Sequence, residues 1–263
     1  MLQTRMRAAP LWCTLLALAL RPVLGRAQDN YEIQVYGASL VPPAQTMVEL
    51  HSNFTAEGRS AVVDGLLPTE HAVHETLEMT HGFTTWLEIG FYAFTSARDP
   101  GGWSWVGDHI RPRIAAPESW HWPVGVSIST EFGYQRRAFS TDTWTWEIRP
   151  IIDQQVGRWY WAVNPALERS LSGENAGRGW EFSPAAALTY DASAKVTAGF
   201  EYYGALGPVS GFDPAPEQQH QLFAALDLNL SPRWEINLGV GRGFTASTDH
   251  LLIKTIFGYR LQF

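Results

Sequence analysis

Cysteine is nearly absent from this chain: the single one, Cys13, lies in a segment that we expect to be removed on export. Arg5 and Arg7 precede a short apolar run over 11–20, and Gly25-Arg26-Ala27 places small residues where a signal peptidase cleaves. Residues 1–27 are therefore predicted to be a signal peptide, cleaved near Ala27. The remaining chain then has no cysteine, which excludes disulfides, a thiolate nucleophile and cysteine metal sites.

Long apolar runs and basic residues are also scarce. The run over 11–20 is about half of what a spanning helix needs, and no later run approaches that length, so transmembrane helices are not expected. Cleavage would leave 15 Lys and Arg against 26 Asp and Glu, which moves the formal charge from −7 to −11. An acidic chain without a basic patch is a poor nucleic-acid binder. A hydrophobic content of 45% is too high for disorder.

Alternating apolar and polar residues are abundant instead. Over 221–230 every second residue is Leu or Ala, while residues such as Gln221 and Asp227 fill the other positions. This period of two is typical of a strand with one apolar face. Twelve such segments recur, over 46–55, 72–81, 84–96, 104–115, 122–135, 142–155, 158–171, 178–190, 195–207, 218–230, 234–246 and 250–263.

The lengths of these segments and of their links favour a membrane barrel over a soluble sandwich. Most segments have about ten residues or more, as a tilted transmembrane strand requires, whereas a soluble strand usually has about five or six. Short links such as 156–157 alternate with longer ones such as 56–71 and 208–217. We therefore predict an all-β, single-domain antiparallel transmembrane barrel of about twelve strands over 46–263, with short periplasmic turns and longer extracellular loops.

Tryptophans sort to the two ends of the predicted strands, where amphipathic rings prefer the lipid headgroup level. The expected aromatic belts consist of Trp105, Trp122, Trp144, Trp146, Trp159, Trp161, Trp180 and Trp234. Four prolines fall inside predicted strands, at Pro112, Pro150, Pro165 and Pro184, and each removes a ladder donor. We expect bulges or bends at these four positions.

Residues 28–45 precede the first predicted strand. We interpret them as a periplasmic segment tucked under the barrel mouth, in which 32–36 has the pattern of a short strand ended by Pro42-Pro43. At the other end, Tyr259, Leu261 and Phe263 share a face of an aromatic last strand. This strand resembles the signal read by the barrel-insertion machinery. The predicted partners are thus this machinery, outer-membrane lipid and small solutes, in the bacterial outer membrane.

Several short stretches resemble an uncharacterised group of bacterial outer-membrane proteins, over nearly the whole mature chain. These stretches are Val35-Tyr36, Val41-Pro42-Pro43, Glu49-Leu50-His51-Ser52-Asn53, His109-Ile110-Arg111-Pro112-Arg113, Glu147-Ile148-Arg149-Pro150 and Tyr259-Arg260-Leu261-Gln262-Phe263. The pattern of long strands is more distantly similar to the phenol-degradation MetA-pathway outer-membrane family. The close resemblance implies a barrel without an assigned activity, and the distant one suggests transport.

If apolar residues face lipid, the opposite register faces the lumen, with ten acids and five bases. The expected lumen charge network is Glu49, His51, Glu88, His109, Arg111, Arg113, Glu131, Glu147, Arg149, Glu201, Asp227, Glu235, Lys254 and Arg260. Hairpin geometry predicts Glu88 beside Arg111 and Arg113. It also predicts Glu131 opposite Glu147, with Arg149 diagonal to both. Glu235 should lie beside Arg260, and barrel closure brings Lys254 or Arg260 towards Glu49.

Two functions fit such a lumen. In the first, the charges form the polar core of a closed barrel with a structural or interaction role, in which pairs such as Glu131 and Glu147 share protons. In the second, they line a narrow water-filled path through the barrel. Because about five acids would lack a base, we predict a channel for small solutes that favours cations.

The sequence gives less support for an enzyme than for a channel or a structural barrel. A lipid hydrolase needs a His-x-Ser pair on one strand face, but His51 and Ser52 are adjacent and should point to opposite faces. Asp108-His109 and Asp249-His250 lack the second aspartate of an outer-membrane protease. Glu70, His71 and His74 are too loose a cluster to indicate a metal. We therefore predict no catalytic residues, no cofactor and no metal.

Overall fold

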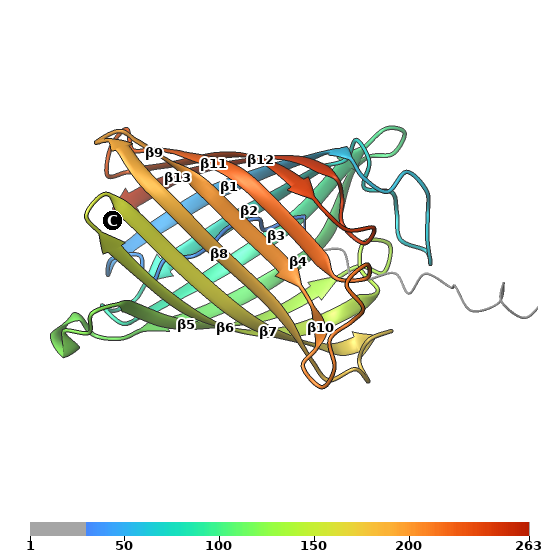
Figure 1. Ribbon diagram of the computed structural model, residues 1–263, viewed down its shortest axis with the longest axis horizontal. Coiled ribbons are helices and arrows are strands. Elements are labelled where there is room, and N and C mark those ends of the chain that lie inside the picture. The colour runs from blue at the N-terminus through green and yellow to red at the C-terminus, as the bar shows by residue number, and fades with distance from the viewer. Residues whose placement is uncertain (1–29, 263) are drawn as a thin grey trace, which may run out of the picture.

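The computed structural model of the protein describes residues 30–262, and twelve long strands account for most of them (Figure 1). These strands are β1 (Gln45–Glu57), β2 (Val73–Gly82), β3 (Leu87–Arg98), β4 (Gly102–Ala115), β5 (Gly125–Gln135), β6 (Asp142–Val156), β7 (Trp159–Gly173), β8 (Trp180–Ser193), β9 (Val196–Ala205), β11 (Gln219–Leu228), β12 (Trp234–Gly243) and β13 (Leu251–Gln262). A two-residue strand, β10 (Gly207–Pro208), and a short 3-10 turn, η1 (Glu118–Trp120), complete the described elements. Each predicted segment corresponds to one long strand, so the expected fold class is confirmed.

The sheet closes on itself. Each long strand pairs antiparallel with the next along the chain, and β1 pairs with β13 from Gln45 opposite Gln262 to Glu57 opposite Leu251. The short β10 pairs with the start of β8, beyond the part of β8 that pairs with β9, and Gly207 lies opposite Phe182 there. Closure leaves no long edge with unpaired backbone groups, which a barrel in lipid requires.

Burial alternates along the strands in the way that the sequence pattern predicts. In β2, side chains such as Thr76 and Glu78 are buried in the interior, whereas the alternate residues Leu77 and Met79 are more than 40% exposed. Large apolar residues on other strands, including Phe91 and Phe257, are likewise about half exposed. The outer wall is therefore apolar and the inner wall polar, the reverse of a soluble barrel.

The prolines inside strands interrupt the ladders without producing the expected bulges. Next to Pro112 the β4–β5 ladder skips two residues and resumes in the same register. Around Pro150 and Pro165 the β6–β7 ladder skips three residues and also keeps its register. Pro165 lies opposite Pro184 in an unshifted part of the β7–β8 ladder. The register shifts lie elsewhere, near strand ends, as between Phe94 and Thr95. A bulge requires an extra residue in one strand. A proline only removes an amide donor, so it breaks a hydrogen bond without shifting the register.

The alternation of link lengths is less regular than predicted. The link after β3 shrinks to residues 99–101, because β3 and β4 extend until Arg98 lies opposite Gly102. The link after β4 grows to 116–124 and contains η1. The other links follow the expected alternation, with 58–72, 206–218 and 244–250 at one end of the barrel and 157–158 and 194–195 at the other. We call these the long-loop end and the short-turn end.

No helix within residues 30–262 is long and apolar enough to cross a membrane.

Candidate functional site

Residues 30–44 run through the inside of the barrel from one end to the other; they are drawn in blue in Figure 1. At the long-loop end, Asn30 Nδ2 donates to Asp249 Oδ2 at 2.6 Å. At the short-turn end, Ala44 N donates to the carbonyl of Gly82 at 2.9 Å, and the chain then turns into β1. This corrects the sequence interpretation: the segment lies within the lumen, not under its mouth, and 32–36 forms no strand. We call residues 30–44 the lumen segment.

Side chains of the barrel wall satisfy the backbone of the lumen segment. Asn164 holds the backbone of Tyr36 on both sides, accepting from its N–H at 2.8 Å and donating to its carbonyl at 2.9 Å. Three other wall side chains donate to carbonyls of the segment: Asn53 to Asn30 (2.9 Å), Thr76 to Tyr31 (2.6 Å) and Lys254 to Ile33 (3.0 Å). Two carboxylates accept from its N–H groups: Asp153 from Ala38 (3.0 Å) and Glu88 from Val41 (2.6 Å). Buried backbone groups need such partners, so these polar side chains take the place of a neighbouring strand.

Apolar side chains of the lumen segment fill the rest of the contact. Three buried clusters each contain one or more of its residues: Tyr31 packs with Tyr92, Phe94 and Val106; Ile33 packs with Tyr203, Phe223 and Leu252; and Tyr36 and Ala38 pack with Ile151. The hydrophobic core of this protein is therefore inside the barrel. Apolar residues in the lumen-facing register, such as Phe223, Leu252 and Ile256, are buried there and are the signal in the sequence that indicates an internal partner.

Three arginines of the wall gather around Glu32 and Tyr36 of the lumen segment. Arg111 and Arg149 each lie 3.8 Å from Glu32 Oε1, and the Arg111 guanidinium carbon lies 4.3 Å from the centre of the Tyr36 ring. Arg149 and Arg113 lie over the same ring at 5.1 and 5.8 Å. Cations over an aromatic face are attracted by its quadrupole, so the arginines fix the middle of the segment in place.

The predicted pairing of Glu88 holds, since Arg113 Nε lies 3.0 Å and Arg111 Nη2 3.9 Å from Glu88 Oε1. Arg111 is shared, because its Nη2 also lies 2.8 Å from Glu78 Oε1.

Glu131 lies opposite Glu147, as hairpin geometry requires, but the two carboxylates do not pair with each other. Glu131 binds the His109 ring, and Glu147 Oε1 lies 2.7 Å from Arg149 Nε. Gly133 makes the first contact possible, because a Cβ there would lie 2.1 Å from His109 Nε2. Each acid therefore has its own base, and the shared-proton arrangement considered for this pair is wrong.

Lys254 does not reach Glu49. Its fully buried side chain passes over β12 and β11 and binds Glu201 of β9, while the Tyr203 hydroxyl donates to the same carboxylate at 2.6 Å. Gly239 of β12 leaves the space for this crossing, since a Cβ there would lie 2.9 Å from Lys254 Cε. Because Gly239 has no side chain, Lys254 extends towards Glu201 and not towards Glu49, the partner that we expected.

The remaining network residues lie towards the short-turn end. Asn237 donates to Asp227 Oδ1 at 2.7 Å, and Gln34 of the lumen segment donates to Glu235 Oε1 at 3.3 Å. Arg260 donates to the carbonyl of Pro232 at 3.3 Å. No salt bridge within residues 30–262 joins Arg260 to Glu235 or Glu49.

A cavity of about 450 Å³ remains between the lumen segment and the barrel wall, where residues of β2 to β9 line it, and it reaches the long-loop end. Its acidic lining residues outnumber its arginines by seven to four. The acids are Glu32, Asp64, Glu131, Glu147, Glu168, Glu174 and Glu181, and the arginines are Arg59, Arg98, Arg149 and Arg178. The surplus of carboxylates makes this cavity the candidate path or binding site of the protein.

The loop over 58–72 leans over the mouth of this cavity. Leu67 N donates to the carbonyl of Ala138 at 2.8 Å, and Thr69 Oγ1 donates to Asp249 Oδ1 at 2.6 Å, so the loop contacts two other loops. Arg59 Nη2 donates to the carbonyl of Leu67 at 2.7 Å. Burial lowers the pKa of the Arg59 guanidinium, and the Asp249 carboxylate opposes that shift. These contacts narrow the entrance.

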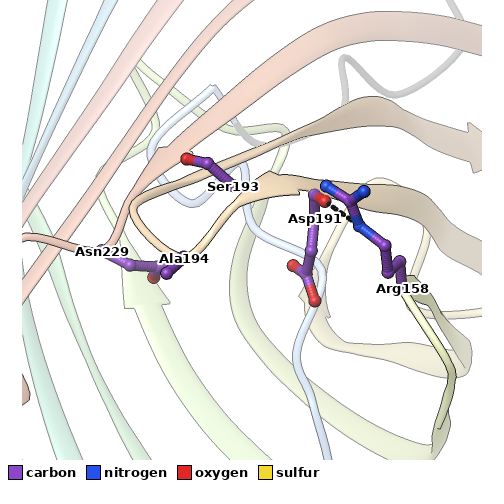
Figure 2. A pocket seen from close by; sticks show the side chains of 5 residues that line it. All are labelled: Arg158, Asp191, Ser193, Ala194 and Asn229. Atoms are coloured by element: carbon purple, nitrogen blue, oxygen red, sulfur yellow. Dashed lines mark hydrogen bonds between the residues drawn. The ribbon is translucent and has the colours of Figure 1, made fainter.

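A second hollow lies at the short-turn end, lined by Arg158, Asp191, Ser193, Ala194 and Asn229, as Figure 2 shows. Its charged groups are engaged in holding neighbouring turns together. Arg158 Nε donates to the carbonyl of Asp191 at 2.7 Å, and the Asp191 carboxylate accepts from Thr197 and Gln155. We therefore regard it as a surface feature of the turns.

The predicted belt tryptophans lie on the outer surface near the two ends. At the long-loop end Trp105 stacks on Tyr134, Tyr134 contacts Trp144, and Trp146 contacts Trp180. At the short-turn end Trp159 contacts Tyr190 and Trp234 contacts Tyr259, both with ring centres 4.9 Å apart. Trp122 is 51% exposed next to Trp120, and Trp161 is partly buried on β7. Contact of these rings with lipid stays a prediction.

The last strand carries Tyr259 and Leu261 on β13, whereas Phe263 and the predicted signal peptide lie outside the described residues. On β1, His51 is fully buried in the lumen, while Ser52 faces outwards and donates to Glu75 at 2.6 Å. The two side chains therefore cannot form the nucleophile and base of a hydrolase.

No protein-family model matches the chain, and no curated protein matches it by sequence. Solved structures do resemble it. The COG4313 outer membrane channel from Pseudomonas putida F1 aligns with a TM-score of 0.58 and 8% identity over 88% of this chain and 100% of that one. The two chains therefore share a barrel fold.

Two porins align in the same way. The NanC porin has a TM-score of 0.54 and 10% identity over 82% of this chain and 100% of the porin. The KdgM porin has a TM-score of 0.50 and 10% identity over 81% and 98% of the two chains. At these identities the likeness establishes the barrel fold.

Proposed function

We propose that the protein is a narrow outer-membrane channel for small solutes with a preference for cations. One observation carries this proposal: inside a closed barrel with an apolar outer wall, a cavity of about 450 Å³ stays open beside the lumen segment, with seven acids against four arginines in its lining. A cavity of this size has room for a small molecule. Carboxylates in a confined, low-dielectric passage attract cations and repel anions.

The fold likeness to three channels supports the same function, as does the distant resemblance to the MetA-pathway family. We also infer that the protein resides in the outer membrane after removal of residues 1–27, that its belts contact lipid, and that its last strand engages the insertion machinery. Catalysis is not part of the proposal, because the one nucleophile and base pair suggested by the sequence points to opposite faces.

The proposal is tested by the reversal potential of the purified barrel in a planar bilayer under a salt gradient. Wild type should favour cations. Glu131→Gln combined with Glu147→Gln should weaken that preference, because both side chains line the cavity and the substitutions remove two of its negative charges, leaving Arg149 with Glu32 as its carboxylate neighbour. Glu57→Gln is the matched control, since Glu57 is exposed at the rim and pairs with Arg242 outside the cavity.

The lumen segment favours one alternative function, a barrel that does not conduct and has a structural or interaction role. Its backbone is hydrogen-bonded to the wall at points from the carbonyl of Asn30 to the N–H of Ala44. Absence of conductance from a barrel that is demonstrably folded and inserted would favour that alternative.

A further inference from the structure

Glu49, His51 and Glu78 form a compact group on the lumen wall that the channel does not require. Glu49 and His51 are two residues apart on β1 and so share a face, and Glu78 of β2 lies directly opposite Glu49. One ligand atom from each of the three residues lies within 4.8 Å of the others. Their exposed fractions are 5%, 0% and 1%.

Polar atoms in this group lack hydrogen-bond partners. They are both ring nitrogens of His51, Glu49 Oε1 and Glu78 Oε2. Burial without a partner is costly for any of these atoms. One nitrogen of His51 and one oxygen of each glutamate lie close to one another in a single small volume, which points to a bound group.

The separation between His51 Nε2 and Glu78 Oε2 is 3.4 Å. This is longer than a hydrogen bond between charged groups, which is about 2.7–2.9 Å. It equals the spacing of two ligands that each lie about 2.1 Å from a tetrahedral ion, which is about 3.4 Å. The geometry therefore fits an ion between the two side chains better than a proton.

No basic side chain in the described part of the chain balances the negative charge of Glu49. Glu78 uses its other oxygen, Oε1, for Arg111, whereas Glu49 forms no salt bridge with a base anywhere in the described chain, residues 30–262. Gly258 of β13 separates Glu49 from a further carboxylate, Glu235 of β12, since it lies opposite both. Like charges facing each other across strands are destabilising, and a cation would remove the repulsion.

We propose that Glu49, His51 and Glu78 bind one zinc ion, through a ring nitrogen of His51 and one oxygen of each carboxylate. Three protein ligands of these types, with a fourth position for water, are typical of zinc, whereas calcium and magnesium need about six oxygens. The ion joins β1 to β2. Through Glu78 and Arg111 it also connects to Tyr36 of the lumen segment, over whose ring that guanidinium lies. Occupancy of this site is independent of whether the lumen conducts.

The test is the zinc content of the full-length protein, folded with zinc supplied, freed of excess metal and measured by mass spectrometry. Wild type should retain about one zinc per chain. Glu49→Gln and His51→Gln should each lower the zinc content roughly tenfold or more, since even outer-sphere changes weaken metal sites by that factor. His74→Gln is the matched control: His74 is equally buried on β2, with both ring nitrogens unpartnered, but it belongs to no such group.

Heat-modifiable migration on a gel verifies the fold of each variant, and X-ray absorption at the zinc edge of wild type needs no variant at all. The expected spectrum has only nitrogen and oxygen neighbours, at about 2.0–2.2 Å. Zinc-free wild type, or zinc retained by folded His51→Gln at the wild-type level, would overturn the proposal.

Discussion

Replacing Lys254 by methionine should destabilise the barrel and loosen the lumen segment together. The Lys254 side chain is fully buried, binds Glu201, and donates to the carbonyl of Ile33 at 3.0 Å. Methionine has a similar length and can still pass over Gly239, so the packing changes little while the charge and the donor are lost. Glu201, itself only 6% exposed, is then left without its cation.

The expected magnitude follows from the burial of both partners. Breaking a buried ion pair by removing one side costs about 3–5 kcal/mol, whereas replacing both sides by apolar residues is close to neutral. Lys254→Met should therefore cost about 3 kcal/mol or more, and Lys254→Met with Glu201→Leu should recover most of it. The surface pair Arg242 and Glu57, at 3.2 Å and more than half exposed, is the control, with an expected coupling of about 0–1 kcal/mol.

Urea unfolding of the barrel in lipid vesicles, followed by tryptophan fluorescence, measures both double-mutant cycles. A coupling between Lys254 and Glu201 as small as that of the surface pair would refute the assignment of this contact as a buried ion pair. Conductance supplies a second measurement. Because Ile33 loses its donor, Lys254→Met should raise the open-channel current, and the Arg242→Met control should not.

Three further predictions concern assembly, topology and the lumen segment. Deleting Phe263 should lower the amount of heat-modifiable barrel in the outer membrane while leaving export intact; equal amounts in both strains would contradict it. Single cysteines in this otherwise cysteine-free mature chain should be labelled on intact cells at Gly211 and not at Ser193, and the opposite result would reverse the topology. Deleting residues 30–42 behind the signal peptide should raise the single-channel conductance, because the segment fills much of the lumen; an unchanged value would mean that solutes do not pass beside it.

The barrel itself is predictable from the sequence because its information is local. The period of two in a segment such as 221–230 fixes which side chains face outwards, and strand length then separates a membrane barrel from a soluble one. Neighbours across a hairpin follow from the same count, as for Glu88 with Arg113 and Glu131 opposite Glu147. These features need only residues that are close in the sequence or joined by one turn.

The contents of the lumen depend on contacts between distant residues. The lumen segment has no regular period, and its backbone partners, such as Asn53 on β1, Glu88 on β3 and Asn164 on β7, come from strands all around the barrel. Lys254 reaches Glu201 because Gly239, on a strand between them, has no side chain. Sequence alone determined a closed barrel with an apolar exterior and an acidic interior. Only the tertiary structure decided that the chain's own N-terminal residues occupy that interior, because their partners become neighbours only once the barrel has closed.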